Sequence, residues 1–370
     1  MKILFIVQGE GRGHLTQAIS LERLLRDSGH DVVEMLVGKS ESRRLPGFFV
    51  RSVHAPIRQF TSPNFLPTQA NRRVNMPRSV VYNIFRFPDY VESMCYINRR
   101  IKESGADMVV NFYELLTGLT YFLFRPSVPQ VCIGHQYLFL HRDFGLPKRN
   151  RFSLRLMNLF TRLTSLGAKR KLALSFRPMA NDGDIHVIPP LLRADVFTQE
   201  CTDGDYIHGY LLNSGFAESV RRWHKAYPDV PLHFFWDFQG EEPVTKIDDT
   251  LSFHQLDDVD FLRRMAGCKA YASTAGFESV CEAMYLGKPI LMVPAHIEQE
   301  CNAYDAVRNG AGVADEDFNL ERLLKFAETY RPNPDFVRWT QSAGSVILDE
   351  LESFFPQNQL RHMFMVEEFV

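Results

Sequence analysis

The stretch Tyr271–Gly312, YASTAGFESVCEAMYLGKPILMVPAHIEQECNAYDAVRNGAG, decides the fold. It opens with a short strand-like run that ends in a Ser-Thr-Ala-Gly turn. Apolar residues at helical spacing follow, and Gly287 stands at the position of a helix C-cap. The apolar run Ile290–Val293 predicts a buried strand, and a polar loop then leads into a helix that ends at Asn309-Gly310. This order predicts a βαβα unit with a parallel sheet.

Two features of this stretch indicate a binding site. The turn Ser273–Gly276 precedes a helix N-terminus, where free backbone N–H groups and the helix dipole favour an anion such as a phosphate. Glu282 lies on the same helix, at helical spacing from Glu278 and Ser279. An ordinary Ser/Thr N-cap and a solvated glutamate explain each feature taken alone. The combination with the residues that follow favours a functional site.

The combined pattern resembles the donor-site signature of UDP-sugar glycosyltransferases with the GT-B fold. By pattern it is most similar to the UDP-glucuronosyl and plant UDP-glycosyltransferases and to the MurG-type enzymes. The resemblance implies an α/β fold with two Rossmann-like, doubly wound domains that face a cleft, and a C-terminal helix that crosses back to the first domain. The matching residues are Gly276, Ser279, Glu282, Gly287-Lys288-Pro289, Pro294, Glu298-Gln299 and Asn302-Ala303.

The N-terminus contains a second glycine-rich turn. An apolar strand at Lys2–Val7 is followed by Gln-Gly-Glu-Gly-Arg-Gly-His and by a helix predicted from about Leu15 to Ser28. The turn does not fit the dinucleotide fingerprint G-x-G-x-x-G, and no acidic residue ends the second strand, so a nicotinamide or flavin enzyme is disfavoured. The turn resembles the G-x-G-H opening of GT-B enzymes, in an uncharacterised prokaryotic branch with the sequence G-E-G-R-G-H. That resemblance implies that Gly11 and Gly13 bring backbone close to the substrate.

The same resemblance implies a catalytic base. In inverting plant-type enzymes the matching histidine takes the proton of the acceptor hydroxyl, and an aspartate from a later strand orients it. His14 stands in the histidine position, although a lone histidine at a helix start is more often only a polar end residue. Asn111 stands where the aspartate is expected, and Glu114 is a substitute three residues on. The predicted catalytic residues are therefore His14, Asn111 and Glu114.

The resemblance also assigns the donor-binding residues. Backbone N–H groups near two helix starts would hold the diphosphate, Glu282 would bind the ribose hydroxyls, and the Glu-Gln pair would hold the sugar. Thr274 replaces a histidine that touches the phosphate in plant enzymes. Main chain after the His-Gln-Leu segment would read the uracil. The predicted donor-binding set is Gly11, Gly13, Ser214, Gly215, His254, Gln255, Leu256, Ser273, Thr274, Ala275, Gly276, Phe277, Ser279, Glu282, Glu298 and Gln299.

Composition and length fit a two-domain globular protein. The chain has 370 residues, 45% of them apolar and 23% charged, with no apolar run of the length that spans a bilayer. Its six cysteines form no C-x-x-C pair, so neither a zinc site nor a disulfide framework is indicated. The sequence has no convincing D-x-D metal pair, so we expect no metal and no cofactor other than the donor substrate. The expected location is the cytoplasm, and nucleic acid is not an expected partner.

Charge is divided unevenly along the chain. Residues 1–175 contain 26 Lys and Arg against 12 Asp and Glu, whereas residues 176–370 contain 16 against 32. Two prolines lie where the sign changes, which marks a domain boundary. The predicted division is an N-terminal acceptor-side domain (1–185), a C-terminal donor domain (186–340) and a C-terminal helical segment (341–370). The basic half suggests an anionic partner.

Basic residues of the first half are the candidates for that partner. Arg72, Arg73 and Arg78 lie in or beside a proline-rich stretch that would contact an anionic acceptor, although a solvated loop is equally consistent with the pattern. His135 follows a strand at a cleft edge. The segment 142–174 is basic and amphipathic, and its apolar face consists of Phe152, Leu156, Leu159, Phe160, Leu163 and Leu166. Such a segment fits an anionic membrane surface at the inner face of the plasma membrane, but a helix that packs this face on a sheet gives the same pattern and is the favoured interpretation.

Three functions fit the pattern. The first is an inverting, metal-independent transfer of a sugar from a UDP-sugar to an unknown acceptor, which could be anionic, lipid-linked or a glycan. The second is a non-catalytic protein that binds nucleotide sugars, which the asparagine in the aspartate position keeps open. The third is a UDP-sugar 2-epimerase, which ranks lower because the several carboxylates and bases of that chemistry are not placed by the sequence.

Overall fold

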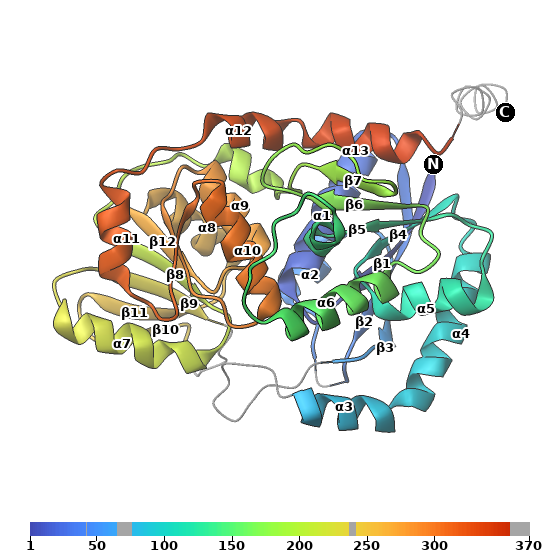
Figure 1. Cartoon of the computed structure of the whole chain (residues 1–370), viewed down its shortest axis with the longest axis horizontal. Helices are drawn as coiled ribbons and strands as arrows, with labels where there is room; N and C mark the ends of the chain where they lie inside the picture. Colours follow the sequence, from blue (N-terminus) through green and yellow to red (C-terminus); the bar gives the residue numbers. More distant parts are fainter. Residues whose placement is uncertain (42, 65–75, 237–241, 356–370) are drawn as a thin grey trace.

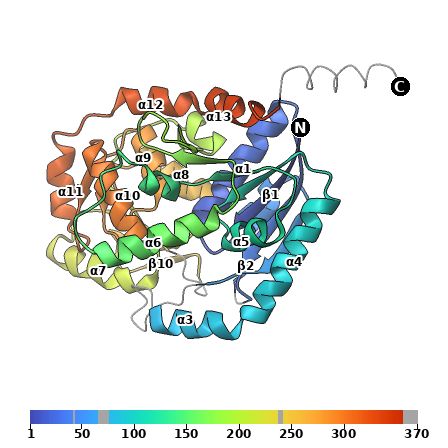
Figure 2. The same cartoon turned by 45° about the vertical axis from the view of Figure 1, so that its right-hand side comes forward.

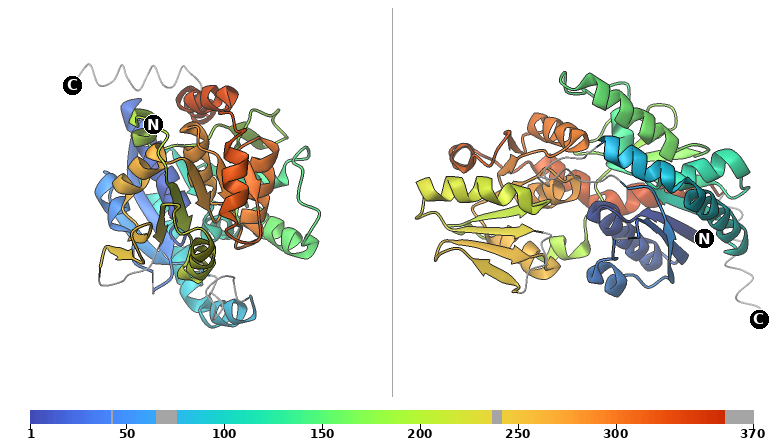
Figure 3. Two further views of the ribbon diagram at one scale, coloured as in Figure 1. Left: turned by 90° about the vertical axis from the view of Figure 1, so that its left-hand side faces the viewer. Right: turned by 90° about the horizontal axis from the view of Figure 1, so that it is seen from below.

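Two seven-stranded sheets organise the computed structural model, which describes residues 1–41, 43–64, 76–236 and 242–355 (Figure 1). Each sheet forms the centre of one lobe, and the two lobes lie side by side when the molecule is turned (Figure 2, Figure 3). The first lobe is drawn in blue and green, and the strands of the second lobe are yellow and orange. This α/β arrangement of two sheets with helices agrees with the prediction from sequence.

The first sheet is parallel throughout. Its strands are β1 (Lys2–Gln8), β2 (Asp31–Lys39), β3 (Ile57–Thr61), β4 (Met108–Phe112), β5 (Gln130–Ile133), β6 (Arg170–Leu174) and β7 (Ile185–Ile188). Their spatial order is β3-β2-β1-β4-β5-β6-β7, and every neighbouring pair runs parallel. The order reverses between β1 and β4, which makes that position the topological switch point of the sheet.

The second sheet repeats this plan with one antiparallel edge strand. Its strands are β8 (Ile207–Leu211), β9 (Leu232–Trp236), β10 (Val244–Lys246), β11 (Leu251–Gln255), β12 (Ala270–Ser273), β13 (Ile290–Met292) and β14 (Gly312–Ala314). They lie in the order β10-β11-β9-β8-β12-β13-β14, and β10 runs antiparallel to β11 at the edge. The switch point lies between β8 and β12.

Helices follow the strands in both lobes. The first lobe contains α1 (Arg12–Asp27), α2 (Gly47–Ser52), α3 (Met76–Phe85), α4 (Phe87–Glu103), α5 (Leu115–Phe124), the 3₁₀ turn η1 (His135–Leu140) and α6 (Arg151–Thr164). The chain then continues through η2 (Ala194–Thr198), η3 (Ser214–Phe216), α7 (Ala217–Ala226), α8 (Asp258–Gly267), α9 (Phe277–Tyr285), α10 (Ile297–Arg308), α11 (Leu320–Ala327), α12 (Pro334–Gln341) and α13 (Ala343–Glu352). The βαβα unit predicted from sequence is β12–α9–β13–α10.

The central strand β1 shows how each sheet becomes a two-sided core. Its side chains alternate between the two faces of the sheet. Phe5 packs with Leu21 and Leu25 of α1 on one face, whereas Ile6 packs with Ile97 of α4 on the other. The core on the α1 side continues without interruption into residues of α9 and α13. Apolar packing therefore joins the two lobes.

The C-terminal helices return to the first lobe. In Figure 1, α12 and α13 cross the top of the molecule from the second lobe to a position beside β7. Arg170 donates to Glu350 at 2.7 Å, and His186 pairs with the same carboxylate at 2.8 Å. The predicted crossing helix is confirmed, although it is two helices divided at Ser342 rather than one. The predicted domain limits stay a prediction; β7 of the first sheet ends at Ile188.

One helix buries a different face from the one that the sequence favoured. The expectation was that Phe152, Leu156 and Leu159 of α6 pack on the sheet. The structure instead exposes 80%, 42% and 51% of these residues. The buried face consists of Leu154, Met157, Thr161 and Thr164. The threonines are favoured inside because Tyr113 and Tyr137 of the first lobe hydrogen-bond to their hydroxyls, at 2.7 and 3.0 Å.

Candidate functional site

Two glycine-containing loops meet at the switch point of the second sheet. Ser214 and Gly215 follow β8, and the turn Ser273–Gly276 follows β12, which pairs directly with β8. Ligands of open α/β sheets bind at this position, outside the carboxyl ends of the strands. The structure therefore brings together the two segments that the sequence proposed for the diphosphate.

The turn before α9 leaves its N–H groups without a side-chain cap. Gly276 is the N-cap residue and, having no side chain, makes no side-chain cap hydrogen bond. Ser273 bends inward instead, and its Oγ accepts from the N–H of Ala275 at 3.1 Å. Ala275 adopts a left-handed conformation with φ of 61°, which a residue with a Cβ rarely does. An uncapped helix start held by a strained turn is suited to an anion.

Two buried polar atoms beside this turn have no partner within the described residues. The Oγ1 of Thr274 is fully buried and unpaired. Asn302 of α10 donates its Nδ2 to the carbonyl of Ala275 at 3.1 Å, while its Oδ1 is unpaired. Buried polar groups are normally hydrogen-bonded, so unpaired atoms indicate that a ligand or a water completes the site. Both atoms are next to the turn that would hold the phosphates.

Glu282 is held by an arginine that the sequence did not connect with it. The guanidinium of Arg193, on the linker between the sheets, donates to both oxygens of Glu282, at 2.7 and 3.1 Å. Glu282 is 3% exposed. A carboxylate has about four lone-pair sites, and this fork uses two of them. The remaining acceptor sites are what ribose hydroxyls would need, so the pair fixes the orientation of the carboxylate without using it up.

The other predicted donor residues have less specific surroundings. The first donor loop is capped in the ordinary way, because Asn213 accepts from the N–H of Gly215 at 3.2 Å. His254 is buried, stacks on Phe235 and pairs with the hydroxyl of Ser252 at 2.9 Å. Burial lowers the pKa of His254 to about 4. Its side chain is a packing element of β11, which leaves only backbone near Gln255 and Leu256 for a base.

Glu298 and Gln299, the predicted sugar-binding pair, have different partners in the structure. Gln299 is buried and its Oε1 accepts from the N–H of Ala295 at 2.8 Å, so it stabilises the turn before α10. Glu298 reaches across to the first lobe, where Gln136 donates to it at 2.9 Å. Burial raises the pKa of Glu298 to about 7. Of the two, Glu298 is the one placed at the contact between the lobes.

His14 lies at the contact between the lobes, in the first turn of α1. Its Nδ1 is 3.4 Å from the Oε1 of Gln17, and its Nε2 is 3.5 Å from the Nε2 of Gln136. The ring stacks on Tyr113 with centroids 5.5 Å apart. Burial lowers the pKa of His14 to about 4, which keeps the imidazole neutral near pH 7. A neutral ring is the form that can accept a proton.

The two residues proposed as partners of His14 are used elsewhere. The amide of Asn111 donates to the carbonyls of Glu114 and Thr164 and accepts from the N–H of Glu114, so it fixes the turn after β4. Glu114 caps α5 and accepts from Ser62 at 2.7 Å. The structure therefore does not bring the side chains of Asn111 and Glu114 to His14. Asn111 bonds only to backbone in these contacts, and the Oε1 of Glu114 is taken up by Leu116 and Ser62, which sequence spacing cannot reveal.

The predicted acceptor side is also revised. His135 is 1% exposed, its Nδ1 donates to the carbonyl of Leu174 at 2.6 Å, and its ring stacks on Phe277 at 3.9 Å. It is a packing residue between the lobes and does not face open space. Arg78 is exposed on α3, and Arg72 and Arg73 lie outside the described residues.

Two of the predicted glycines have different roles. Gly11 is the N-cap of α1, with space beside it. Gly13 faces the second lobe, where an added Cβ would collide with the carboxylate of Glu278. Glycine at this position therefore leaves the space that the Glu278 carboxylate occupies.

Sequence reasoning missed Gln17 and Arg193. Gln17 had a signal, because it lies one helical turn after His14 on the same face. Arg193 had none, since its partner Glu282 is far away along the chain and meets it only through the fold.

Three aspartates around the start of α8 have partners within the protein. Asp257 caps α8, Asp258 pairs with Arg12 at 2.7 Å, and Asp260 pairs with Arg264 at 2.9 Å. Among the residues that the structure describes, no group of three or more His, Cys, Asp or Glu side chains is arranged to hold a metal ion.

A family profile described as glycosyl transferase family 1 matches residues 1–330. The chain belongs to this family. Among curated proteins, UDP-glucuronosyltransferase 2B17 of Mus musculus is 28% identical over 117 residues, which are 32% of this chain and 21% of that protein. The aligned region thus spans about a fifth of that relative.

Solved structures show the fold over nearly the whole chain. The kitacinnamycin glycotransferase has a TM-score of 0.62 at 16% identity, covering 96% of this chain and 99% of that one. UGT89C1 of Arabidopsis thaliana complexed with UDP-L-rhamnose has a TM-score of 0.58 at 14% identity, covering 94% of both chains. The predicted GT-B fold and the resemblance to UDP-glucuronosyl and plant-type glycosyltransferases are confirmed.

Proposed function

We propose that this protein transfers a sugar from a UDP-sugar to an acceptor hydroxyl, with inversion and without a metal ion. The observation that supports this most is the position of His14. It lies on the helix that contacts α9, so a neutral imidazole is next to the uncapped helix start proposed for the diphosphate. A proton acceptor and an anion site on opposite sides of one cleft are what glycosyl transfer needs.

The proposed reaction follows from these two groups. The acceptor oxygen would attack the anomeric carbon from the face opposite the leaving diphosphate, which inverts that centre. As the new C–O bond forms and the bond to phosphate breaks, His14 Nε2 would take the hydroxyl proton. The N–H groups at the start of α9 and the hydroxyl of Thr274 would stabilise the charge that develops on the diphosphate.

The choice of UDP rests on Glu282 and on the family. Its carboxylate, oriented by Arg193, has free acceptor sites for two ribose hydroxyls. A structural neighbour with the same fold was solved with UDP-L-rhamnose. Metal independence is supported by the pairing of Asp257, Asp258 and Asp260 with groups of the protein itself.

Donor binding is tested by thermal unfolding with UDP. A ligand that binds only the folded state stabilises it by about 2.7 kcal/mol at a concentration 100 times its Kd, so UDP should raise the Tm measurably. Replacing Glu282 alone leaves Arg193 without its partner, and breaking a buried pair costs about 3–5 kcal/mol. We therefore expect the double variant Arg193→Met/Glu282→Gln to lose most of the increase that UDP causes.

The matched control for lost stability is Glu22→Gln. Glu22 is a buried carboxylate of α1 that accepts from the N–H groups of His54 and Ala55, away from the donor loops. This variant should have a lower Tm and an unchanged increase with UDP. A wild-type protein whose Tm does not respond to UDP would contradict the proposed donor.

A non-catalytic role in binding nucleotide sugars is the second candidate, and the local use of Asn111 favours it. Turnover distinguishes the two. The proposed enzyme should release UDP from a UDP-sugar in a mixed pool of acceptors, in the presence of EDTA, and His14→Gln should abolish the release. Binding of UDP without transfer or hydrolysis would favour the non-catalytic role. The epimerase stays lower, because the cleft carboxylates have structural partners.

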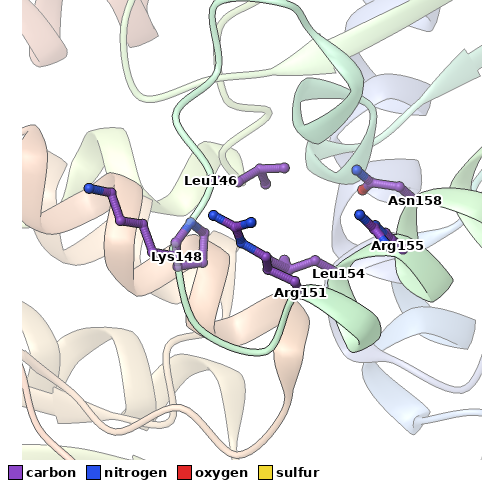
Figure 4. A pocket seen from close by; sticks show the side chains of 7 residues that line it. Leu146, Lys148, Arg151, Leu154, Arg155 and Asn158 are labelled. Carbon is purple, nitrogen blue, oxygen red and sulfur yellow. The ribbon is translucent and has the colours of Figure 1, made fainter.

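We further propose that α6 binds an anionic membrane surface, which would present a lipid-linked acceptor. Its exposed stripe of Phe152, Leu156 and Leu159 is apolar. Figure 4 shows Lys148, Arg151 and Arg155 among the residues that line a pocket, and Arg151 and Arg155 belong to the same helix as the stripe. The helix has no acidic residue. A cationic rim around apolar side chains is complementary to anionic headgroups over acyl chains. In the described residues no helix has the length and apolar character needed to cross a bilayer.

Vesicle sedimentation tests this surface. Each cationic residue near an anionic bilayer contributes about 1 kcal/mol, so Arg151→Gln/Arg155→Gln should lower partitioning onto phosphatidylglycerol vesicles about 30-fold. Arg23→Gln removes an exposed cation from α1 of the same lobe and should have little effect. Equal binding to vesicles of phosphatidylcholine alone, or an equal loss with Arg23→Gln, would show that α6 is not the membrane surface.

A further inference from the structure

A chain of side chains links His14 to the second lobe. Gln17 places its Oε1 3.4 Å from Nδ1 of His14. The Nε2 of the same amide donates to Oε1 of Glu278, which lies on α9. Gly13 makes this approach possible, because a Cβ there would collide with the Glu278 carboxylate. The chain His14–Gln17–Glu278 thus connects the base with a carboxylate of the opposite lobe.

Hydrogen-bonding capacity decides how this chain is oriented. An ionised carboxylate can only accept hydrogen bonds, so the NH₂ group of Gln17 must face Glu278. The amide oxygen of Gln17 then faces His14 and can only accept from the ring. The proton of the neutral imidazole must therefore be on Nδ1, and the lone pair is on Nε2. Glu278 therefore determines which way the Gln17 amide points, although its carboxylate does not touch His14.

The Nε2 side of the ring has room for a substrate group. Its one neighbour among the hydrogen bonds of the described residues is the Nε2 of Gln136, at the long distance of 3.5 Å. The Oε1 of Gln136 is buried and unpaired in the same part of the structure. An acceptor hydroxyl that enters here would donate to His14 Nε2. The unpaired Oε1 of Gln136, next to this hydroxyl, could accept a hydrogen bond from another substrate group.

We propose that Gln17 and Glu278 are the positioning residues of His14, in place of a directly bonded carboxylate. Gln17 fixes the Nδ1–H tautomer, and Glu278 fixes Gln17. When His14 takes the acceptor proton, the charge of Glu278 stabilises the imidazolium through the polarised amide. Because Glu278 belongs to the second lobe, the base is prepared only when the lobes are in contact. This inference rests on the proposed function for its kinetic consequence, but not for the tautomer.

The contact between Gln17 and Glu278 has a simpler explanation, which is that it only holds the two lobes together. The two explanations differ in what His14 does when the contact changes. A purely structural contact leaves the ring tautomer unaffected by the chemistry of residues 17 and 278. The other ionisable groups that face the ring are Tyr113 beside it, Glu298 through Gln136, and the Arg12–Asp258 pair at the start of α1. None of them contacts Nδ1.

The tautomer is measured by ¹⁵N NMR of the full chain labelled at histidine, with the His14 signal identified by its loss in His14→Gln. At pH 7.5 the wild type should be almost entirely the Nδ1–H form. Gln17→Met, which removes the acceptor, should give a mixture of tautomers. Glu278→Gln should also give a mixture, because an amide no longer dictates which way Gln17 points. The volume of Glu278→Gln is unchanged, so it serves if Gln17→Met does not fold.

Two further variants sharpen the comparison. Glu300→Gln removes another carboxylate that bonds between the lobes, to Asn150 at 2.8 Å, and it should leave the tautomer unchanged. The exchange Gln17→Glu/Glu278→Gln puts the carboxylate next to the ring and the amide across from it. Every hydrogen bond can then form again, so the Nδ1–H form should return. An unchanged tautomer in both Gln17→Met and Glu278→Gln would overturn the proposal.

Kinetics provide the second readout. With turnover established, Glu278→Gln should lower kcat about 10- to 100-fold, within the contribution of a positioned general base, and leave KM for the UDP-sugar unchanged. The exchange variant should recover most of kcat. If no variant or wild type turns over, the proposed function fails while the tautomer result still stands. A fall in kcat as large in Glu300→Gln would indicate loosened lobes and contradict the positioning role.

Discussion

At the scale of single residues, Glu114 is the buried group with the most distinct consequence. It is fully buried, Ser62 and the N–H of Leu116 donate to its Oε1, and its Oε2 has no partner in the described residues. Burial raises the pKa of Glu114 to about 7 from an ordinary 4.5. The group is therefore neutral in mild acid, and ionising it in place opposes folding.

The sign of the pH dependence follows by linkage. Because the folded pKa lies above the unfolded one, the stability that protonated Glu114 contributes is complete below about pH 4.5 and is lost as the pH rises through about 7. Full ionisation costs about 3 kcal/mol. We expect the free energy of unfolding of the wild type to fall more between pH 5 and pH 8 than that of Glu114→Gln. Glu298 titrates in both proteins, so its contribution cancels when the two free energies of unfolding are subtracted at each pH. If the free energies of both proteins change equally with pH, Glu114 does not have the raised pKa.

At the scale of helices and loops, the sequence predicted the features that depend on neighbouring residues in the chain, such as turns. The glycine-rich turn after β1 and the turn Ser273–Gly276 lie at strand ends as predicted, because glycine and small polar residues report backbone requirements directly. The predicted end of the first turn was wrong, since α1 already begins at Arg12 rather than at Leu15. The periodicity of α6 predicted a helix but not its buried face. That face is decided by hydroxyl partners of Tyr113 and Tyr137, which no pattern within α6 contains.

In the candidate site too, sequence spacing predicted the residues that lie close together in the chain and missed contacts between distant ones. Glu282 and the start of α9 could be proposed from spacing, since they belong to one helix and one loop. The partners of His14 could not, except for Gln17, which is one turn away on the same helix. Gln136 lies beside His14 because β1 and β5 belong to the same sheet, and Glu278 reaches Gln17 only because the two lobes are in contact. Such contacts are consequences of topology, and a single sequence does not encode them in its spacing.

At the scale of the whole molecule, the uneven charge has a structural role. The first lobe is basic and the second is acidic, and several polar contacts join a donor of the first to a carboxylate of the second or of α13. They are Arg12–Asp258, Gln17–Glu278, Gln136–Glu298, Asn150–Glu300, Arg170–Glu350 and His30–Glu352. Part of the basic surplus that suggested an external anionic partner thus faces the protein's own second lobe.

The pair Arg12–Asp258 allows this role to be measured. Its side chains are 22% and 31% exposed and 2.7 Å apart. A double-mutant cycle with Arg12→Met and Asp258→Asn should give a coupling free energy of about 1 kcal/mol at low salt, which falls in 1 M NaCl because salt screens partly exposed charges. The pair Arg23–Asp27 within α1, more exposed and 3.9 Å apart, should give almost none. Equal coupling in both pairs would mean that charge between the lobes contributes nothing specific. A measurable, salt-sensitive coupling would instead mean that these charges help to hold the contact between the lobes that places Glu278 against Gln17.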